Sequence, residues 1–310
     1  MKLLVLFKKI FSYIFFLPLA VIARGFKFVG NLLLIFSSNL IYIRSGNFFF
    51  KDFKTDLILK KKIKFKNYEI FARVNNFWDY WRTKNFETYP VDIILKDLKE
   101  YFKQNRQIHY YEIGANVGYS SIFISKILKD TGESFAFEID PTNFKTFNDN
   151  IILNNLKNLT PFNIGISSEN KISKFYYNTK FSNNKFNLPA SSMGMHSLNF
   201  NQDLHKKEVY CLSPLLKFSD VLRLFNLPKP THLFIDAYGA EKTIIDSILQ
   251  CDKKLYPDVI MVDIEEKVNS IQDSQIFKIL KLNNYVLINH DLEFGNQEVP
   301  NSYKSVFRKQ

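Results

Sequence analysis

The stretch that most constrains the fold runs from residue 108 to residue 128, where a short apolar strand leads through two glycines into a helix. Ile108–Ile113 is apolar and aromatic, as a buried parallel strand is. Gly114 and Gly118 lie within five residues of each other, in a chain with only 10 glycines. Glycine permits a tight turn and the close approach of a ligand. This order of elements predicts the ligand-binding turn of an α/β sheet, although a plain turn has the same outline.

Strands and helices alternate along the rest of the chain. We expect strands at residues 68–74, 134–139, 160–166, 173–178, 232–236, 258–264 and 285–289, and helices at 90–102, 142–154, 213–225, 240–249 and 272–282. Asp140-Pro141 and Ser213-Pro214 are typical starts of helices. Such alternation predicts an α/β fold with a mostly parallel sheet that helices cover on both faces.

The first 66 residues differ from the rest in charge. They contain 13 Lys/Arg and two acids, whereas residues 110–310 contain 22 bases and 22 acids. Two uncharged apolar runs, residues 10–23 and 28–43, fall short of the ~20 residues that a spanning helix needs. An anchor lying in an anionic membrane surface, a signal peptide ending near Ala23, and core helices all remain open. We therefore divide the chain into a basic extension, 1–66, and a domain, 67–310.

Lysines crowd residues 60–66, at the end of this extension. They predict either a basic rim against phospholipid or a solvated edge strand whose lysines deter pairing. The neutral remainder of the chain argues against a nucleic-acid partner. Two cysteines and five scattered histidines give no disulfide framework and no metal-ligand spacing. We expect a cytoplasmic protein without a structural metal, located at the inner face of the membrane if the extension is an anchor.

Acidic residues flank the glycine turn. Glu112 precedes it, and Glu138 ends the next strand, where its carboxylate can accept hydrogen bonds from ribose hydroxyls. The turn reads Glu-x-Gly-x-Asn-x-Gly, not the G-x-G-x-x-G of a dinucleotide site. A carboxylate here would repel a pyrophosphate but would suit the ammonium group of S-adenosyl-L-methionine. The alternative for Glu138 is a plain surface acid.

These segments resemble the FkbM family of S-adenosylmethionine-dependent methyltransferases. Residues 112–118 (Glu-Ile-Gly-Ala-Asn-Val-Gly) look like its D-I-G-A-N-x-G motif, and residues 136–138 like its A-F-E. Residues 233–241 (Leu-Phe-Ile-Asp-Ala-Tyr-Gly-Ala-Glu) are similar to its K-I-D-V-E-G-A-E segment, and residues 257–260 to the strand that follows. The resemblance covers about residues 75–290, including a lead-in at 81–88. Two positions depart from the pattern: Phe234 replaces a lysine, and Tyr238 replaces the middle acid.

The resemblance implies a class I methyltransferase fold (Rossmann-like) and methyl transfer to a hydroxyl of a sugar, glycolipid or secondary metabolite. Asp236 is then expected to orient or deprotonate the acceptor. The expected cofactor-binding residues are Glu112 near the ammonium, Gly114, Ala115, Asn116, Gly118 and Tyr119 in the turn, Glu138 at the ribose, and Asn163 and Gly165 near the adenine. The acceptor, whether small molecule or glycan, is not specified.

Two other classes of function remain open. One is an NAD-dependent oxidoreductase on a Rossmann-like fold, although Asn116 occupies the place of its middle glycine. The other is a membrane-surface scaffold with a decayed methyltransferase domain, which the departures at Phe234 and Tyr238 motivate. His196, in the long polar segment 179–201, and His232 are weaker catalytic candidates, for which we favour other roles.

Overall fold

The computed structural model describes residues 59–74, 82–83, 86, 88–104, 106–177, 209–264, 266, 268–293 and 302–310. The apolar runs of the N-terminal extension lie outside these residues, and so does the whole polar segment 179–201 with His196. The predictions made for them are therefore not addressed by the structure.

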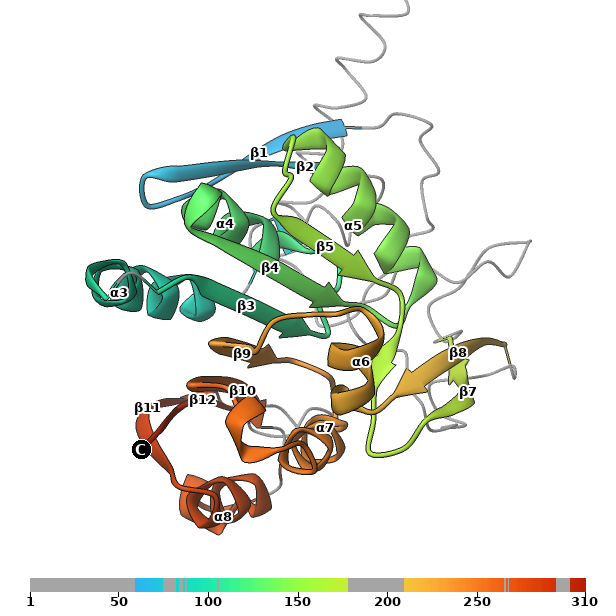
Figure 1. Cartoon of the computed structure of the whole chain (residues 1–310). Coiled ribbons are helices and arrows are strands. Elements are labelled where there is room, and N and C mark those ends of the chain that lie inside the picture. The colour runs from blue at the N-terminus through green and yellow to red at the C-terminus, as the bar shows by residue number, and fades with distance from the viewer. Residues whose placement is uncertain are drawn as a thin grey trace, which may run out of the picture. The chain divides into compact units, whose positions relative to one another are not determined.

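A seven-stranded sheet forms the centre of the described chain (Figure 1). Its strands are β3 (Ile108–Ile113), β4 (Gly132–Phe137), β5 (Leu159–Phe162), β9 (His232–Ile235), β10 (Val259–Ile264), β11 (Tyr285–Glu293) and β12 (Ser302–Lys309). Their order is β11-β12-β10-β9-β3-β4-β5. The pairs from β10 to β5 are parallel, whereas β12 runs antiparallel to both β10 and β11.

This strand order is that of the class I methyltransferase fold, in which the last strand inserts antiparallel between its two predecessors. The predicted Rossmann-like fold is therefore confirmed. The sequence prediction missed β12, although its Val306 and Phe307 are fully buried on opposite faces of the sheet.

Helices cover both faces of the sheet (Figure 1). α3 (Tyr89–Lys103), α4 (Tyr119–Leu128) and α5 (Pro141–Leu153) lie on one face, and α6 (Phe218–Leu224), α7 (Glu241–Leu249) and α8 (Gln275–Leu282) on the other. Side chains along a strand point alternately to the two faces. Tyr110 accordingly joins the first core and Tyr111 the second, and both rings are fully buried.

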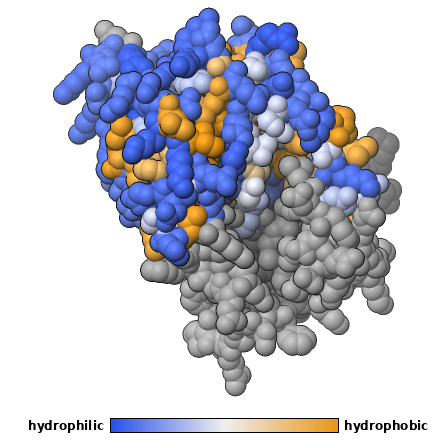
Figure 2. Space-filling model, turned by 90° about the horizontal axis from the view of Figure 1, so that it is seen from below, coloured by the Kyte–Doolittle hydropathy of each residue, from blue (hydrophilic) through white to orange (hydrophobic). Residues whose placement is uncertain are grey.

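The outer surface around the second layer of helices is mostly polar. Figure 2 views the molecule from the side on which α8 lies in Figure 1, and the described surface there is mainly hydrophilic, with smaller hydrophobic areas. Leu282 of α8 and Ile288 of β11 are among the exposed apolar side chains. Scattered exposed apolar residues are normal on soluble proteins and indicate no particular partner.

A two-stranded hairpin packs against the first layer of helices. β1 (Leu59–Phe65) pairs antiparallel with β2 (Tyr68–Val74). Side chains from the end of α5 bind the backbone of β2. Asn150 of α5 accepts a hydrogen bond from the N–H of Arg73 at 2.7 Å, and Asn154, directly after α5, accepts one from the N–H of Phe71 at 2.8 Å. The lysine-rich stretch is thus a strand. The hairpin lies across the boundary that the sequence suggested between the extension, 1–66, and the domain, 67–310.

A smaller sheet follows β5 along the chain (Figure 1). It contains β6 (Gly165–Ile166), β7 (Lys171–Tyr176) and β8 (Tyr210–Leu216), with β8 in the middle. The helix predicted to begin at Ser213-Pro214 is wrong at its start, because both residues lie in β8 and α6 begins at Phe218. Proline has no N–H to donate to a neighbouring strand. It fits here because β6 pairs only with Leu215 and Leu216 of β8 and so does not need an N–H from Pro214.

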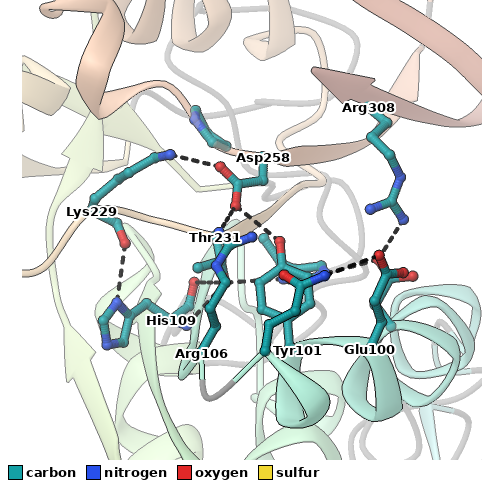
Figure 3. A network of polar contacts seen from close by, with 12 residues as sticks. Glu100, Tyr101, Arg106, His109, Lys229, Thr231, Asp258 and Arg308 are labelled. Atoms are coloured by element: carbon teal, nitrogen blue, oxygen red, sulfur yellow. Dashed lines mark hydrogen bonds and ion pairs between the residues drawn. The ribbon is translucent and has the colours of Figure 1, made fainter. Parts of the chain in front are cut away.

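A polar network fastens the amino-terminal ends of the parallel strands to α3 (Figure 3). Asp258, just before β10, accepts hydrogen bonds from Lys229 at 2.6 Å, from the hydroxyl of Tyr101 at 2.9 Å, and from Arg106. Burial alone would raise the pKa of the Asp258 carboxyl, but these three hydrogen bonds hold it below its usual value. The network lies at the edge of the sheet opposite to the glycine turn.

We predict that Asp258→Asn lowers the free energy of unfolding by about 1.5–3 kcal/mol, because hydrogen bonds to a charged group are lost. Because the pKa is lowered on folding, the stabilisation exists above the unfolded pKa of about 3.9 and disappears as the pH falls through the folded value. Urea denaturation at pH 7 and pH 3 measures the effect. Asp246→Asn, in the exposed Lys242–Asp246 pair of α7, is the matched control and should cost less than about 0.5 kcal/mol. Equal losses for the two variants would contradict the prediction.

Candidate functional site

The glycine turn lies at the carboxyl-terminal end of β3 and is joined to the end of β4. The N–H groups of Gly114 and Ala115 both donate to the carbonyl oxygen of Phe137, at 2.9 and 3.0 Å. Gly114, Asn116 and Gly118 all have positive φ, at 89°, 55° and 82°. The turn therefore needs residues that tolerate the left-handed region, and glycine and asparagine are the usual ones.

Neighbouring protein atoms also require glycine at both positions. A Cβ at Gly114 would lie 1.8 Å from the carbonyl oxygen of Asp236, after β9, and one at Gly118 would lie 1.9 Å from the ring of Phe147 in α5. Both glycines are thus explained by packing within the protein. The close approach of a ligand, which the sequence prediction invoked, is not needed to account for them.

Glu112 is buried and serves the amino-terminus of α4. Its carboxylate accepts hydrogen bonds from the hydroxyl of Tyr110 at 3.3 Å and from the hydroxyl of Ser121, the third residue of α4. The residue before α4, Gly118, gives no side-chain cap, so the carboxylate compensates the start of the helix. The start of the helix that follows the predicted ligand-binding turn thus already has a protein carboxyl group against it. Burial raises the pKa of Glu112 to about 8, against the lowering effect of Ser121 and Tyr110.

Glu138 is buried at the end of β4 and holds the turn from the other side. One carboxylate oxygen accepts the N–H of Asn116 at 2.6 Å, and the other accepts the N–H of Asp140 at 2.8 Å. Burial and the charge of Asp140 raise the pKa of Glu138 to about 7, and the two N–H groups and the charge of Arg82 act in the opposite direction. Each carboxylate oxygen can accept a further hydrogen bond, so the residue still has capacity for a ligand.

Arg82 is a residue that the sequence analysis did not single out. It is buried, with 5% of its surface exposed, and its charge acts on Glu138. The sequence placed it in a lead-in segment that carries no catalytic motif. A buried cation beside a strand-end carboxylate can only be found once the fold brings the two segments together.

Two asparagines, Asn116 in the turn and Asn143 in the first turn of α5, have side-chain acceptor atoms that are unused. Within the described part of the chain, the buried Oδ1 atoms of Asn116 and Asn143 have no hydrogen-bond partner. Asn116 is held by Glu138, and Asn143 is the third residue of α5, whose capping residue Asp140 is also held by Glu138. Buried polar atoms are normally paired, so unpaired acceptors call for a donor. This edge of the sheet thus offers hydrogen-bond acceptors to a ligand that carries donors.

Asn163 and Gly165 lie beside the chain that follows β4, at Glu138 and Ile139 respectively. The side-chain amide of Asn163 donates to the carbonyl oxygen of Glu138 at 2.7 Å and braces the turn into α5. A Cβ at Gly165 would lie 2.5 Å from the side chain of Leu215, so this glycine is explained by the small sheet. An adenine contact for these two residues stays a prediction.

The remaining predicted turn residues belong to the core. Ala115 and Tyr119 are each 4% exposed, and the Tyr119 ring packs edge-on against Phe86, with centroids 6.4 Å apart. Phe234, which replaces the family's lysine, is 1% exposed and packs edge-on against Tyr89 at 5.2 Å. This departure therefore fills the core beneath α3.

Asp236 follows β9 and lies against the glycine turn. Its N–H donates to the carbonyl oxygen of Ile113 at 3.0 Å, and its side chain is half-buried. The structure thus brings Asp236 to the same edge of the sheet as Glu112 and Glu138. His232 begins β9 at the opposite edge and contacts Asp97 at 3.1 Å, so a structural role accounts for it. Burial lowers the pKa of His232.

No group of three His, Cys, Asp or Glu side chains that could hold a metal ion occurs among the residues that the structure describes. None of the described helices is long and apolar enough to cross a membrane.

Solved structures with a similar arrangement include several methyltransferases. A precorrin-6y C5,15-methyltransferase from Geobacter metallireducens is 15% identical, with 66% of this chain and 80% of that chain covered and a TM-score of 0.36. M. jannaschii TYW2, solved in complex with AdoMet, is 14% identical, with coverages of 83% and 89% and a TM-score of 0.37. A putative O-methyltransferase from Klebsiella pneumoniae is 12% identical, with coverages of 73% and 82% and a TM-score of 0.37.

No protein-family model matches the chain, and no curated protein matches it. At the identities and TM-scores above, the structural matches carry no argument about activity. The fold assignment depends on the strand order of the sheet itself.

We predict that Gly114→Ala and Gly239→Ala differ sharply in stability. Both glycines have positive φ, at 89° and 81°. An alanine in this left-handed conformation lowers the stability of the folded state by about 1–2 kcal/mol in both variants. A Cβ at Gly114 meets a backbone oxygen, whereas no atom of the described residues lies within 4 Å of a Cβ at Gly239. Gly114→Ala should therefore lose at least about 3 kcal/mol more, or fail to fold. Similar urea midpoints for the two variants would disprove the close contact with Asp236.

Proposed function

We propose that this protein is an S-adenosyl-L-methionine-dependent methyltransferase of the FkbM type, which methylates a hydroxyl of a sugar, glycolipid or secondary metabolite. The observation that carries the proposal is the set of acceptors around Glu138: its carboxylate and the unused oxygens of Asn116 and Asn143. S-adenosyl-L-methionine carries an ammonium, two ribose hydroxyls and an adenine amino group, all hydrogen-bond donors. The residues present therefore fit this cofactor.

The same chemistry disfavours the oxidoreductase alternative. A pyrophosphate needs N–H donors and positive charge at the start of a helix. Here Glu112 occupies the start of α4, and Glu138 binds the N–H of Asn116 in the turn. The donors that a diphosphate needs at this turn are therefore already used by protein carboxyl groups.

In the proposed reaction, bound S-adenosyl-L-methionine supplies a methyl group already activated by its sulfonium. The protein has to hold the acceptor in line and exclude water. Glu138 binds the ribose hydroxyls while keeping the turn in place. Asp236, at the end of β9, orients the acceptor hydroxyl or accepts its proton.

Equilibrium dialysis of the full chain with labelled S-adenosyl-L-methionine and with NAD tests the proposal. We expect the first to bind and the second not to bind. Glu138→Ala should weaken binding at least about tenfold, because charge-assisted hydrogen bonds are lost. Glu133→Ala, exposed on the same strand, is the matched control and should bind normally. NAD binding without S-adenosyl-L-methionine binding would reverse the choice of cofactor, and binding of neither would favour the decayed scaffold.

The pH dependence of the same dialysis gives an independent check. The ribose hydroxyls need the ionised carboxylate, and the pKa of Glu138 is raised to about 7. Affinity should therefore fall as the pH drops below about 7, by up to tenfold per unit, and level off above it. A flat profile from pH 5.5 to pH 8.5 would argue against a ribose contact by Glu138.

We predict that Asp236→Asn lowers methyl transfer by roughly 10²–10⁴-fold, the usual contribution of a general base. Cofactor affinity should stay the same, since Asp236 faces the acceptor in this proposal. Transfer of labelled methyl to extracted cell-envelope glycans and glycolipids measures the rate, with Asp246→Asn on α7 as control. A variant with the wild-type rate would remove Asp236 from the mechanism.

We also propose that residues 1–66 contact an anionic membrane surface. Support comes from the exposed side chains of Lys60, Lys62 and Lys64, which alternate along β1 and so share one face. Lys62 is paired with Glu69 at 3.0 Å, which reduces the free charge of this face. The full chain should float with vesicles that contain anionic lipid and not with neutral ones. A protein that stays at the bottom of the gradient with both would disprove the contact.

A further inference from the structure

The loop between β9 and α7, residues 236–240, is held by the carboxylate of Glu241, the first residue of α7. Glu241 is 4% exposed, and one of its carboxylate oxygens accepts the N–H of Gly239 at 2.8 Å. Burial raises the pKa of this carboxyl, and hydrogen bonds from the backbone of Glu241, Gly239 and Ala237 act in the opposite direction. The carboxylate therefore binds the backbone of the loop at more than one residue.

These contacts differ from the ordinary capping of a helix. A capping side chain binds N–H groups in the first turn of the helix that it serves. Ala240 occupies the capping position of α7 and gives no side-chain hydrogen bond. Gly239 and Ala237 come before that position, so the carboxylate of Glu241 reaches back along the chain. Its hydrogen bonds thus serve the loop as well as the helix.

The conformation of the loop needs such support. Tyr238 and Gly239 are consecutive residues with positive φ, at 39° and 81°. Residues other than glycine rarely adopt the left-handed region, because their Cβ comes too close to a carbonyl oxygen. Such a conformation persists only where the surroundings impose it. Here the N–H of Ala240 donates to the carbonyl oxygen of Ala237 at 3.1 Å, and Glu241 holds Gly239 within the turn that this bond closes.

The loop begins with Asp236, the expected general base. On the side of β3 its backbone is fixed, since its N–H donates to the carbonyl oxygen of Ile113 at 3.0 Å and its own carbonyl oxygen lies against Gly114. On the other side the chain passes directly into the turn that Glu241 holds. The direction of the Asp236 side chain follows from its backbone dihedral angles, which both sets of contacts constrain.

A carboxyl group buried at this position lowers the stability of the fold. Burial disfavours the charge of Glu241, and the charge of Asp263 in β10 acts in the same direction. An apolar residue of similar size would avoid both effects. A destabilising group that holds a strained loop is typical of a functional site.

We infer that Glu241 is a positioning residue for methyl transfer: by binding the N–H of Gly239 it sets the course of the loop, and so places the carboxyl group of Asp236 at the acceptor. This inference rests on the proposed function. Glu241 acts through Asp236, so its loss lowers turnover and leaves the affinity for S-adenosyl-L-methionine unchanged.

The test measures transfer of tritiated methyl by the full chain to extracted cell-envelope glycans and glycolipids, at varied concentrations of S-adenosyl-L-methionine. Glu241→Ala should lower kcat about 10–100-fold, because a small displacement of a catalytic group costs up to about 10²-fold. The KM for S-adenosyl-L-methionine should stay within about twofold of wild type. Glu241→Gln keeps one acceptor oxygen for Gly239 and should therefore lose only about three- to tenfold in kcat.

A double variant shows whether Glu241 acts through Asp236. Adding Glu241→Ala to Asp236→Asn should lower kcat by no more than about twofold further, because an absent base cannot be misplaced. Two losses that multiply would mean that Glu241 affects the rate by another route, and would overturn the inference. If Glu241→Ala does not fold, the same cycle with Glu241→Gln decides.

Glu266→Ala is the matched control, since the carboxylate of Glu266 accepts the N–H groups of Gln275 at 2.8 Å and Ile276 at 3.2 Å at the start of α8. This variant should unfold at a lower temperature than wild type but keep kcat within about twofold, because α8 carries none of the expected site residues. Equal losses of kcat in Glu266→Ala and Glu241→Ala, or a wild-type kcat in Glu241→Ala, would overturn the inference.

The wild-type protein keeps the two proposals apart. Wild-type protein that methylates the extract, with variants that behave otherwise than expected, removes only the role of Glu241. Wild-type protein that transfers no methyl removes the proposed function, and the role of Glu241 with it.

Discussion

The contact between Gly114 and the carbonyl oxygen of Asp236 is the constraint on which the candidate site depends. It brings the chain after β3 so close to the chain after β9 that no side chain fits between them. The N–H of Gly114 is at the same time held by the last residue of β4. Three neighbouring strands therefore end at one level, and the acids that follow or end them meet at one edge of the sheet.

Local signals in the sequence predicted much of this fold. The strand 68–74, the helix near 90–102 and the capped helix after Asp140 are confirmed, since each depends on residues that are close in sequence. The other predictions failed because those elements depend on pairing between segments that are far apart in the sequence. Pro214 fits a strand only because β6 is too short to reach it, and β12 becomes a strand only by insertion between β10 and β11.

The same limit applies to the site. The sequence located Glu112, Glu138 and Asp236, because acids at strand ends stand out against apolar strands. It could not show what each carboxylate contacts, since that depends on which elements the fold places beside it. Glu112 shares a face of β3 with Tyr110 and so meets α4, and the charge of Arg82 acts on Glu138 from a segment that carries no catalytic motif.

The place of β12 in the sheet has a consequence for how the protein is made. Among the strands that the structure describes, β11 pairs with β12 and with no other, and β12 joins it to β10. During synthesis, β10 and β11 therefore leave the ribosome before the strand that links them exists. Until then the backbone N–H and C=O groups along that edge of β10 lack the partner strand that they have in the folded sheet, and the domain completes its core only after residue 309 has been added.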